Sequence, residues 1–194
     1  MDINSLEKLV TKKFKAIKDK KVTLPDMSDP APYDTNNSKR FVGMVPVHDL
    51  DEMTITWNLP YYGGAEDDEQ ETGDQMNLRY FMEVFGNEGE GSILSYLKGK
   101  GYATGLETRR KAMCGCITKF DVNIELTKKG VANHTKVVEA VFKFAQVLKK
   151  KGPQEFVVND INSVGELKYN FPERTDALTL VKSYSRRLAH IDES

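Results

Sequence analysis

The chain has 194 residues, of which 39% are hydrophobic and 29% charged, and its formal net charge is −1 at pH 7. A chain of this length and composition is expected to fold around a core of its own, which argues against a disordered or disulfide-dependent chain. The near-zero net charge gives no reason to expect binding to nucleic acid or to an anionic membrane surface.

The N-terminal residues predict a helix and then a linker. Residues 5–18 place apolar side chains on one helical face, and Asn4 and Glu7 have the spacing of a capping box. Residues 23–40 contain three prolines together with several Asp, Asn and Ser residues, a composition typical of a linker. The N-terminus has no apolar signal core, and no run approaches the roughly 20 apolar residues of a membrane span.

Two strands are expected next. Residues 41–47 are mostly apolar, and residues 53–59 alternate strictly between apolar and polar side chains. The short polar loop between them predicts a hairpin. Residues 61–77 are rich in Asp and Glu, and they indicate either an acidic docking patch or a solvated insertion loop.

The centre of the chain predicts two helices followed by a strand. Leu78, Phe81, Met82 and Phe85 have the spacing of one helical face. A glycine-rich turn follows, with Asn87 and Ser92 available as caps, and a second short helix then begins and stops at Gly99 and Gly101. Residues 102–108 form an extended, partly apolar run, so we expect a strand there.

The second half of the chain predicts one long strand and three helices. Alternate residues from Cys114 to Leu126 share an apolar face, which indicates a strand antiparallel to residues 102–108. Thr127 can cap a helix, Gly152 and Pro153 separate it from the next one, and residues 174–190 form a last helix. These elements together predict an α+β fold, with a mainly antiparallel sheet of about four strands and helices on one face.

The two cysteines, Cys114 and Cys116, are one residue apart. On a strand their side chains would share a face about 6–7 Å apart, so a disulfide between them is not expected. We therefore expect two cysteines on the core face of a strand and a reduced, cytoplasmic setting.

The sequence offers no self-sufficient catalytic motif. The three histidines, His48, His134 and His190, do not have a second histidine three or four residues away, so neither zinc-binding helix motif is present. The pair Cys114 and Cys116 does not have the spacing of a zinc knuckle. The glycines 86, 89 and 91 lack the Lys-Ser/Thr of a phosphate loop, and the glutamates between them would repel phosphate. We therefore expect no metal ligand and no catalytic residue in this chain.

Residues 86–102 read GNEGEGSILSYLKGKGY, and this segment resembles the G-H-E-G-x-G-S-L-L-S-x-L-K-x-K-G-W segment of the insulinase (pitrilysin) family of zinc metallopeptidases. Three further stretches agree in the same order along the chain: 41–47 with Asp49, 121–130 and 151–156. The matched region is the family's second, non-catalytic domain. The resemblance therefore implies a processing-peptidase-like α+β domain, while the zinc ion and the H-x-x-E-H motif belong to a preceding domain of the parent enzyme.

The resemblance also implies a division of the chain and a binding site. Residues 1–22 are similar to the end of the preceding domain, residues 23–40 to the linker, and residues 41–194 to a second domain that we expect to be truncated at its C-terminus. The family's second domain carries an exosite, which anchors the N-terminal part of a peptide substrate. By the match, this site consists of Gly86 and of the strand at Leu106, Glu107 and Thr108.

Physical chemistry is consistent with that site. A strand at a sheet edge has unpaired main-chain groups to which an extended peptide can add, and a glycine lets a backbone approach closely. The sequence departs from the family pattern at Asn87, which replaces a histidine, and at Tyr102, which replaces a tryptophan. Thr108 stands where some members have glycine, and its branched side chain would narrow the groove.

The expected partners are a peptide substrate and the remaining domains of the parent peptidase. The sequence leaves an alternative open, namely a structural or assembly module of a non-peptidase relative. If the closing strand is missing, an exposed strand edge would also allow two copies of the chain to form a homo-oligomer.

Overall fold

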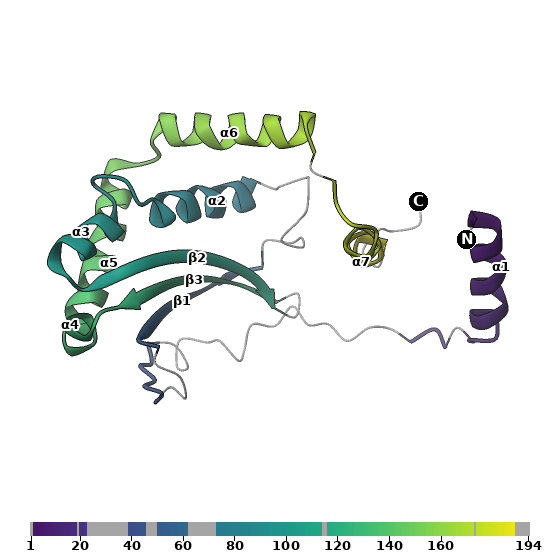
Figure 1. The fold of residues 1–194 in the computed structure, drawn as a ribbon, viewed down its shortest axis with the longest axis horizontal. Coiled ribbons are helices and arrows are strands. Elements are labelled where there is room, and N and C mark those ends of the chain that lie inside the picture. Colours follow the sequence, from purple (N-terminus) through teal and green to yellow (C-terminus); the bar gives the residue numbers. More distant parts are fainter. Residues whose placement is uncertain are drawn as a thin grey trace.

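The computed structural model describes residues 2–18, 20–22, 39–45, 50–61, 73–113, 116–172 and 174–188. This part of the chain forms an α+β fold of seven helices and three strands (Figure 1). In chain order the elements are α1 (Ile3–Phe14), β1 (Glu52–Pro60), α2 (Gly73–Gly86), α3 (Ile93–Lys100), β2 (Ala103–Met113), β3 (Ile117–Leu126), α4 (Lys128–Ala132), α5 (His134–Lys151), α6 (Glu155–Asn170) and α7 (Ala177–Leu188).

The sheet has the strand order β1-β3-β2, and both pairings are antiparallel. The predicted fold class is confirmed, but the expected count of four strands is wrong by one in the described part of the chain. Residues 41–45 form no strand, while residues 46 and 47 lie outside the described residues. The expected hairpin is therefore not found in the described residues, and β1 pairs with β3 instead.

A physical reason for this error lies in the apolar pattern. Residues 53–59 alternate between apolar and polar side chains, but residues 41–45 do not. Residues 41–45 therefore cannot form a strand with one buried apolar face and one solvent-exposed polar face. Their large side chains are exposed, and Phe41 stacks on the ring of His134 with 5.4 Å between ring centroids.

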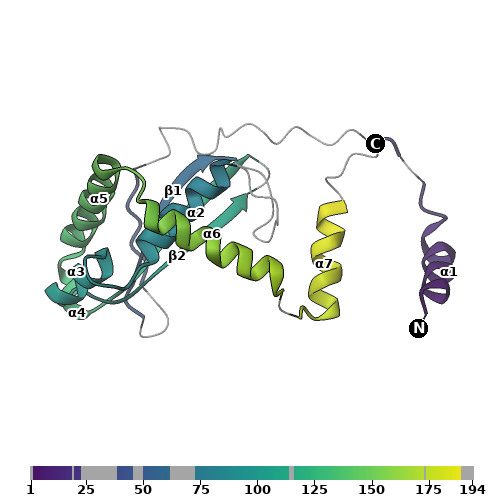
Figure 2. The ribbon, with the colours of Figure 1, turned by 90° about the horizontal axis from the view of Figure 1, so that it is seen from above.

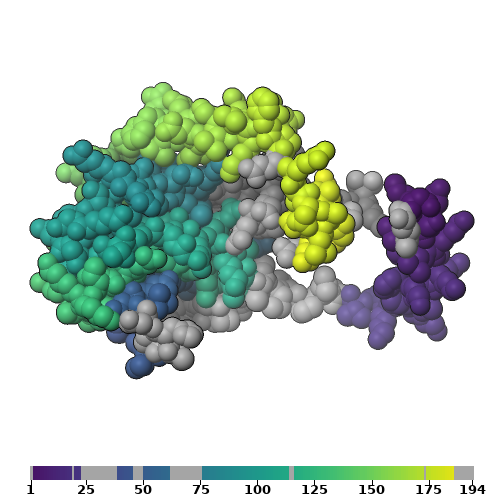
Figure 3. Space-filling view, in the orientation of Figure 1, coloured from purple at the N-terminus to yellow at the C-terminus, as the bar shows by residue number. Residues whose placement is uncertain are grey.

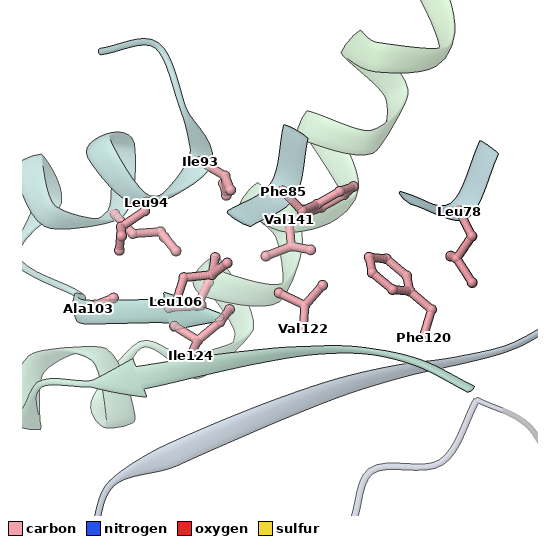
Figure 4. Packing of buried hydrophobic residues seen from close by; sticks show 12 residues of the cluster. Leu78, Phe85, Ile93, Leu94, Ala103, Leu106, Phe120, Val122, Ile124 and Val141 are labelled. Atoms are coloured by element: carbon pink, nitrogen blue, oxygen red, sulfur yellow. The ribbon is translucent and has the colours of Figure 1, made fainter. Parts of the chain in front are cut away.

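The core lies between one face of the sheet and the helices α2, α3 and α5 (Figure 4). Phe120, Val122 and Ile124 project from β3 toward these helices, as the predicted alternation requires. Helix α6 packs over α2 (Figure 2), where the Gln154 main-chain N–H donates to the Tyr80 hydroxyl at 2.9 Å. The opposite face of the sheet, which we call the open face, carries mainly polar side chains, among them Thr54, Thr56 and Asp121.

Several local predictions need correction. The β3 strand begins at Ile117, so Cys116 lies in the preceding turn and is half-buried, rather than on a core strand face; Cys114 lies outside the described residues. The helix predicted after Thr127 is divided into α4 and α5 at Asn133. The N-cap of α1 is Asp2, which accepts a hydrogen bond from the Ser5 N–H at 2.9 Å, rather than Asn4.

The first and last helices do not join this core. Helix α1 buries no residue, although its sequence is amphipathic, and Figure 3 shows it set apart from the sheet. Leu178, Val181 and Tyr184 of α7 are likewise more than half exposed. Among the described helices, none is long and apolar enough to cross a membrane.

Candidate functional site

The strand β2 forms one edge of the sheet that the structure describes. The order β1-β3-β2 gives it a hydrogen-bonded neighbour on one side, β3, where Leu106 lies opposite Ile124 and Thr108 opposite Val122. Alternate N–H and C=O groups of an edge strand point away from the sheet and can bond to another extended chain. Three of the four residues that the resemblance assigned to the exosite, Leu106, Glu107 and Thr108, lie on this strand.

The fourth residue, Gly86, lies beside them. It is the last residue of α2, and a Cβ atom built on it would be 3.5 Å from the Thr108 Oγ1. The Thr108 hydroxyl donates a hydrogen bond of 3.2 Å to the Met82 carbonyl in the last full turn of α2. The structure thus brings Gly86 and Thr108 together, and this hydroxyl ties the end of α2 to the edge strand.

Gly86 has no conformational need to be glycine. Its φ is not positive, and the 3.5 Å distance is an ordinary van der Waals contact. An alanine would therefore fit the fold without strain. A glycine at this position keeps space free between the end of α2 and β2.

Leu106 and Glu107 project to opposite faces of the sheet. The Leu106 side chain is buried in the core, so only its main chain can take part in binding. Glu107 is on the open face, where it pairs with Arg109 and accepts a hydrogen bond of 3.4 Å from the Asn123 Nδ2. The Thr54 hydroxyl in turn donates to the Asn123 Oδ1 at 2.8 Å. The buried Asn123 thereby links the middle of all three strands.

The beginning of β2 is held by the junction between β3 and α4. The Thr127 hydroxyl donates to the Gly101 carbonyl at 2.7 Å and accepts from the Gly130 N–H at 3.0 Å, so it caps α4 as the sequence predicted. Gly130 is buried against the Tyr102 main chain, and a Cβ atom on it would lie 2.0 Å from the Tyr102 carbonyl oxygen. Only glycine permits this approach.

Sequence reasoning missed three residues that shape this region: Met82, Asn123 and Gly130. Gly130 belongs to the stretch 121–130 that carried the family resemblance, so this resemblance could have pointed to it. Met82 contributes a main-chain carbonyl, and Asn123 contributes bonds to residues far away in the sequence. No short-range pattern reports either of these contributions.

The described residues offer no ligand set for a metal ion, since no three His, Cys, Asp or Glu side chains gather there. His134, the one histidine in the described part of the chain, has its Nδ1 3.0 Å from the Val131 carbonyl oxygen. The chemistry available at the β2 edge is therefore main-chain hydrogen bonding bordered by charged side chains.

Fold and site together define an α+β module with a three-stranded antiparallel sheet and a strand edge suited to an extended chain. The family model described as the Peptidase M16 inactive domain matches residues 1–162. The chain therefore belongs to this family, the non-catalytic domain of the insulinase-type zinc metallopeptidases.

The relatives agree with this assignment. The chain is 29% identical to nardilysin of Rattus norvegicus over 191 residues, and 27% identical to the insulin-degrading enzyme of Drosophila melanogaster over 183 residues. These matches cover 93% and 92% of the chain, but 15% and 17% of the two relatives. The crystal structure of pitrilysin matches 94% of the chain with a TM-score of 0.64 at 16% identity, which shows the same fold.

Proposed function

We propose that this chain is the substrate-anchoring domain of a zinc metalloendopeptidase that degrades peptides. The observation that carries the proposal is the position of β2 at a sheet edge, with Gly86 beside Thr108. An extended peptide would add to β2 as a further strand and would bond to the main chain of residues 106–108.

This mode of binding explains why the four site residues contribute so few free side-chain atoms. The Leu106 side chain is in the core, the Thr108 hydroxyl is bonded to Met82, and Glu107 is paired with Arg109. The recognition left to them is mainly that of the main chain, which depends little on the sequence of the peptide.

The hydrolysis itself requires parts that lie outside this chain. We place the zinc ion and its ligands in another domain of the parent enzyme, where zinc would activate the attacking water. The purified chain should therefore hydrolyse no fluorogenic peptide. Cleavage that a chelator abolishes would contradict this part of the proposal.

Peptide binding is best tested with a glycine substitution that the fold tolerates. Gly86→Ala should leave the melting temperature within about 2 °C. It should weaken binding of a labelled 12-residue extended peptide by about fivefold or more, because an unaccommodated methyl group costs about 1 kcal/mol or more. Gly165→Ala on α6 is the matched control, since a Cβ there meets nothing within 4 Å. Amide NMR shifts on titration should concentrate in residues 103–113, and shifts elsewhere alone would refute the anchoring site.

A second candidate is a structural module that holds a larger assembly together. The exposed apolar side chains of α1 and α7 favour it, because such faces are normally covered by a partner. The region encoded upstream of Met1 separates the two functions, since an intact H-x-x-E-H motif supports the peptidase and a degenerate one the assembly role. A third possibility is self-association of two copies through an exposed strand edge, and light scattering that finds only monomer at high concentration would count against it.

A further inference from the structure

The C-terminal half of the edge strand β2 carries three consecutive cations, Arg109, Arg110 and Lys111, which we call the basic strip. Strand alternation places Arg109 and Lys111 on the open face. Arg110 lies opposite Phe120, on the side of the helices. A peptide that adds to β2 would therefore meet positive charge on both of its faces along this half of the strand.

Acidic side chains lie close to one of the three cations, Arg109, which has Asp121 directly opposite on β3. Arg109 pairs with Glu107, but within the described part of the chain neither Arg110 nor Lys111 has an ion pair. Lys111 also lies directly opposite Lys119 on the neighbouring strand, and like charges in that position repel each other.

A second group of acidic residues lies at the other end of the sheet. Glu52 and Glu125 are opposite one another there, and the Thr104 hydroxyl donates to Glu125 at 3.2 Å. The edge that β2 forms in the described sheet therefore changes along its length, from a half beside Glu125 to a half with three consecutive cations. A bound strand with uniform main-chain bonding would still experience this difference in charge.

We propose that the basic strip makes the anchoring site select extended peptides that carry acidic side chains where they pair with residues 109–111. This inference rests on the proposed function. The peptide residue directly opposite Lys111 would have its Cβ about 4.5–5.5 Å away and on the same face. The next peptide residue would lie opposite Arg110 on the other face. Two consecutive acidic residues would thus meet one cation each.

The test uses three 12-residue peptides that are identical except for one adjacent pair, Glu-Glu, Gln-Gln or Lys-Lys. Binding to the full 194-residue chain is followed by fluorescence anisotropy at 50 mM and 500 mM salt, and located by amide NMR shifts. One cross-strand ion pair improves binding roughly two- to fivefold. Glu-Glu should therefore bind roughly tenfold more tightly than Gln-Gln at low salt, and Lys-Lys more weakly than either, with the differences shrinking at high salt.

Charge reversal identifies the residues responsible. Lys111→Glu should reduce the advantage of Glu-Glu over Gln-Gln by two- to fivefold, and Arg110→Gln should do so independently. Lys136→Glu is the control for the Lys111 variant, because it makes the same change in net charge on the exposed first turn of α5. That turn follows the opposite end of β3, and a glutamate is favourable there. The control should leave the peptide preference unchanged.

The outcomes separate this inference from the proposed function. If Gln-Gln shifts the amides of residues 103–113 and Glu-Glu binds no better, the anchoring site stands and the charge selection is wrong. If no peptide shifts those amides, the proposed function itself fails. A loss of preference as large in Lys136→Glu as in Lys111→Glu would also overturn the assignment to the basic strip.

Discussion

Replacing Gly130 by alanine should damage the fold severely, although the change adds only one methyl group. The new Cβ would lie 2.0 Å from the Tyr102 carbonyl oxygen, which is a main-chain atom and cannot rotate away. Helix α4 would have to move by about 1 Å, and overpacking of this kind costs about 1–3 kcal/mol. The same movement would stretch the bonds of Thr127 to the Gly101 and Tyr102 carbonyls, each worth about 0.5–1.5 kcal/mol.

The expected total is a loss of about 3 kcal/mol or more in the free energy of unfolding, a large part of the about 5–15 kcal/mol of a typical domain. Urea unfolding followed by the fluorescence of Trp57, the only tryptophan, measures this loss. Gly99→Ala is the control, because a Cβ there meets nothing within 4 Å, and an alanine within a helix should stabilise by about 0.5–1 kcal/mol. If the two variants unfold at the same urea concentration, the close contact of Gly130 with the Tyr102 main chain does not stabilise the fold.

Two further predictions concern the edge strand and the last helix. Thr108→Val removes the hydroxyl bonded to Met82 with little change in shape, so it should lower the free energy of unfolding by about 1 kcal/mol, measured with urea; no loss would mean that this bond does not hold α2 to β2. Hydrogen bonds from Thr179 hold the pKa of Asp176 below its ordinary value of 3.8. The Asp176 carboxylate also accepts hydrogen bonds from the Leu178 and Thr179 N–H groups, so it caps the start of α7. Because the folded pKa is the lower one, this cap is at full strength above pH 3.8 and is lost as the pH falls through the folded pKa. An NMR titration of this carboxyl with a midpoint above 3.8 would contradict the assignment.

Elements with a clear local pattern could be predicted from the sequence. The strict alternation of residues 53–59 indicated the strand found at Glu52–Pro60. Ser92 was one of two expected caps, and its Oγ accepts from the Ser95 N–H. Gly99 and Gly101 were expected to end this helix; Gly101 does so in the left-handed conformation, with a φ of 69°, whereas Gly99 lies within α3. In these places the bonds that define the element join residues a few positions apart, so the sequence carries the necessary information.

The order of the strands could not be predicted in this way. β1 pairs with β3, and the bond from the Thr56 hydroxyl to Asp121 spans 65 positions in the sequence. A hairpin between residues 41–47 and 53–59 was the shorter connection and was therefore expected. The pairing that forms depends on which strands can bury an alternating apolar face together, and this is a property of the whole core.

The site residues were named through the family resemblance rather than through local chemistry. Nothing in the pattern around Gly86 indicates that Thr108 lies beside it, because this proximity depends on how α2 packs on β2. Strand alternation does account for the opposite directions of Leu106 and Glu107. Whether a peptide binds these residues stays a prediction, which the Gly86→Ala experiment tests.

The exposure of α1 and α7 has a consequence for how the chain melts. Each helix has 12 residues, and α1 buries none of them, so its helicity depends on its own short sequence. Isolated helices shorter than about 12–15 residues are marginal in water. Because these two terminal helices should melt first, circular dichroism should show a gradual decline in ellipticity at low temperature, well before the cooperative transition of the sheet. A calorimeter, which records mainly the cooperative step, should barely register the first event.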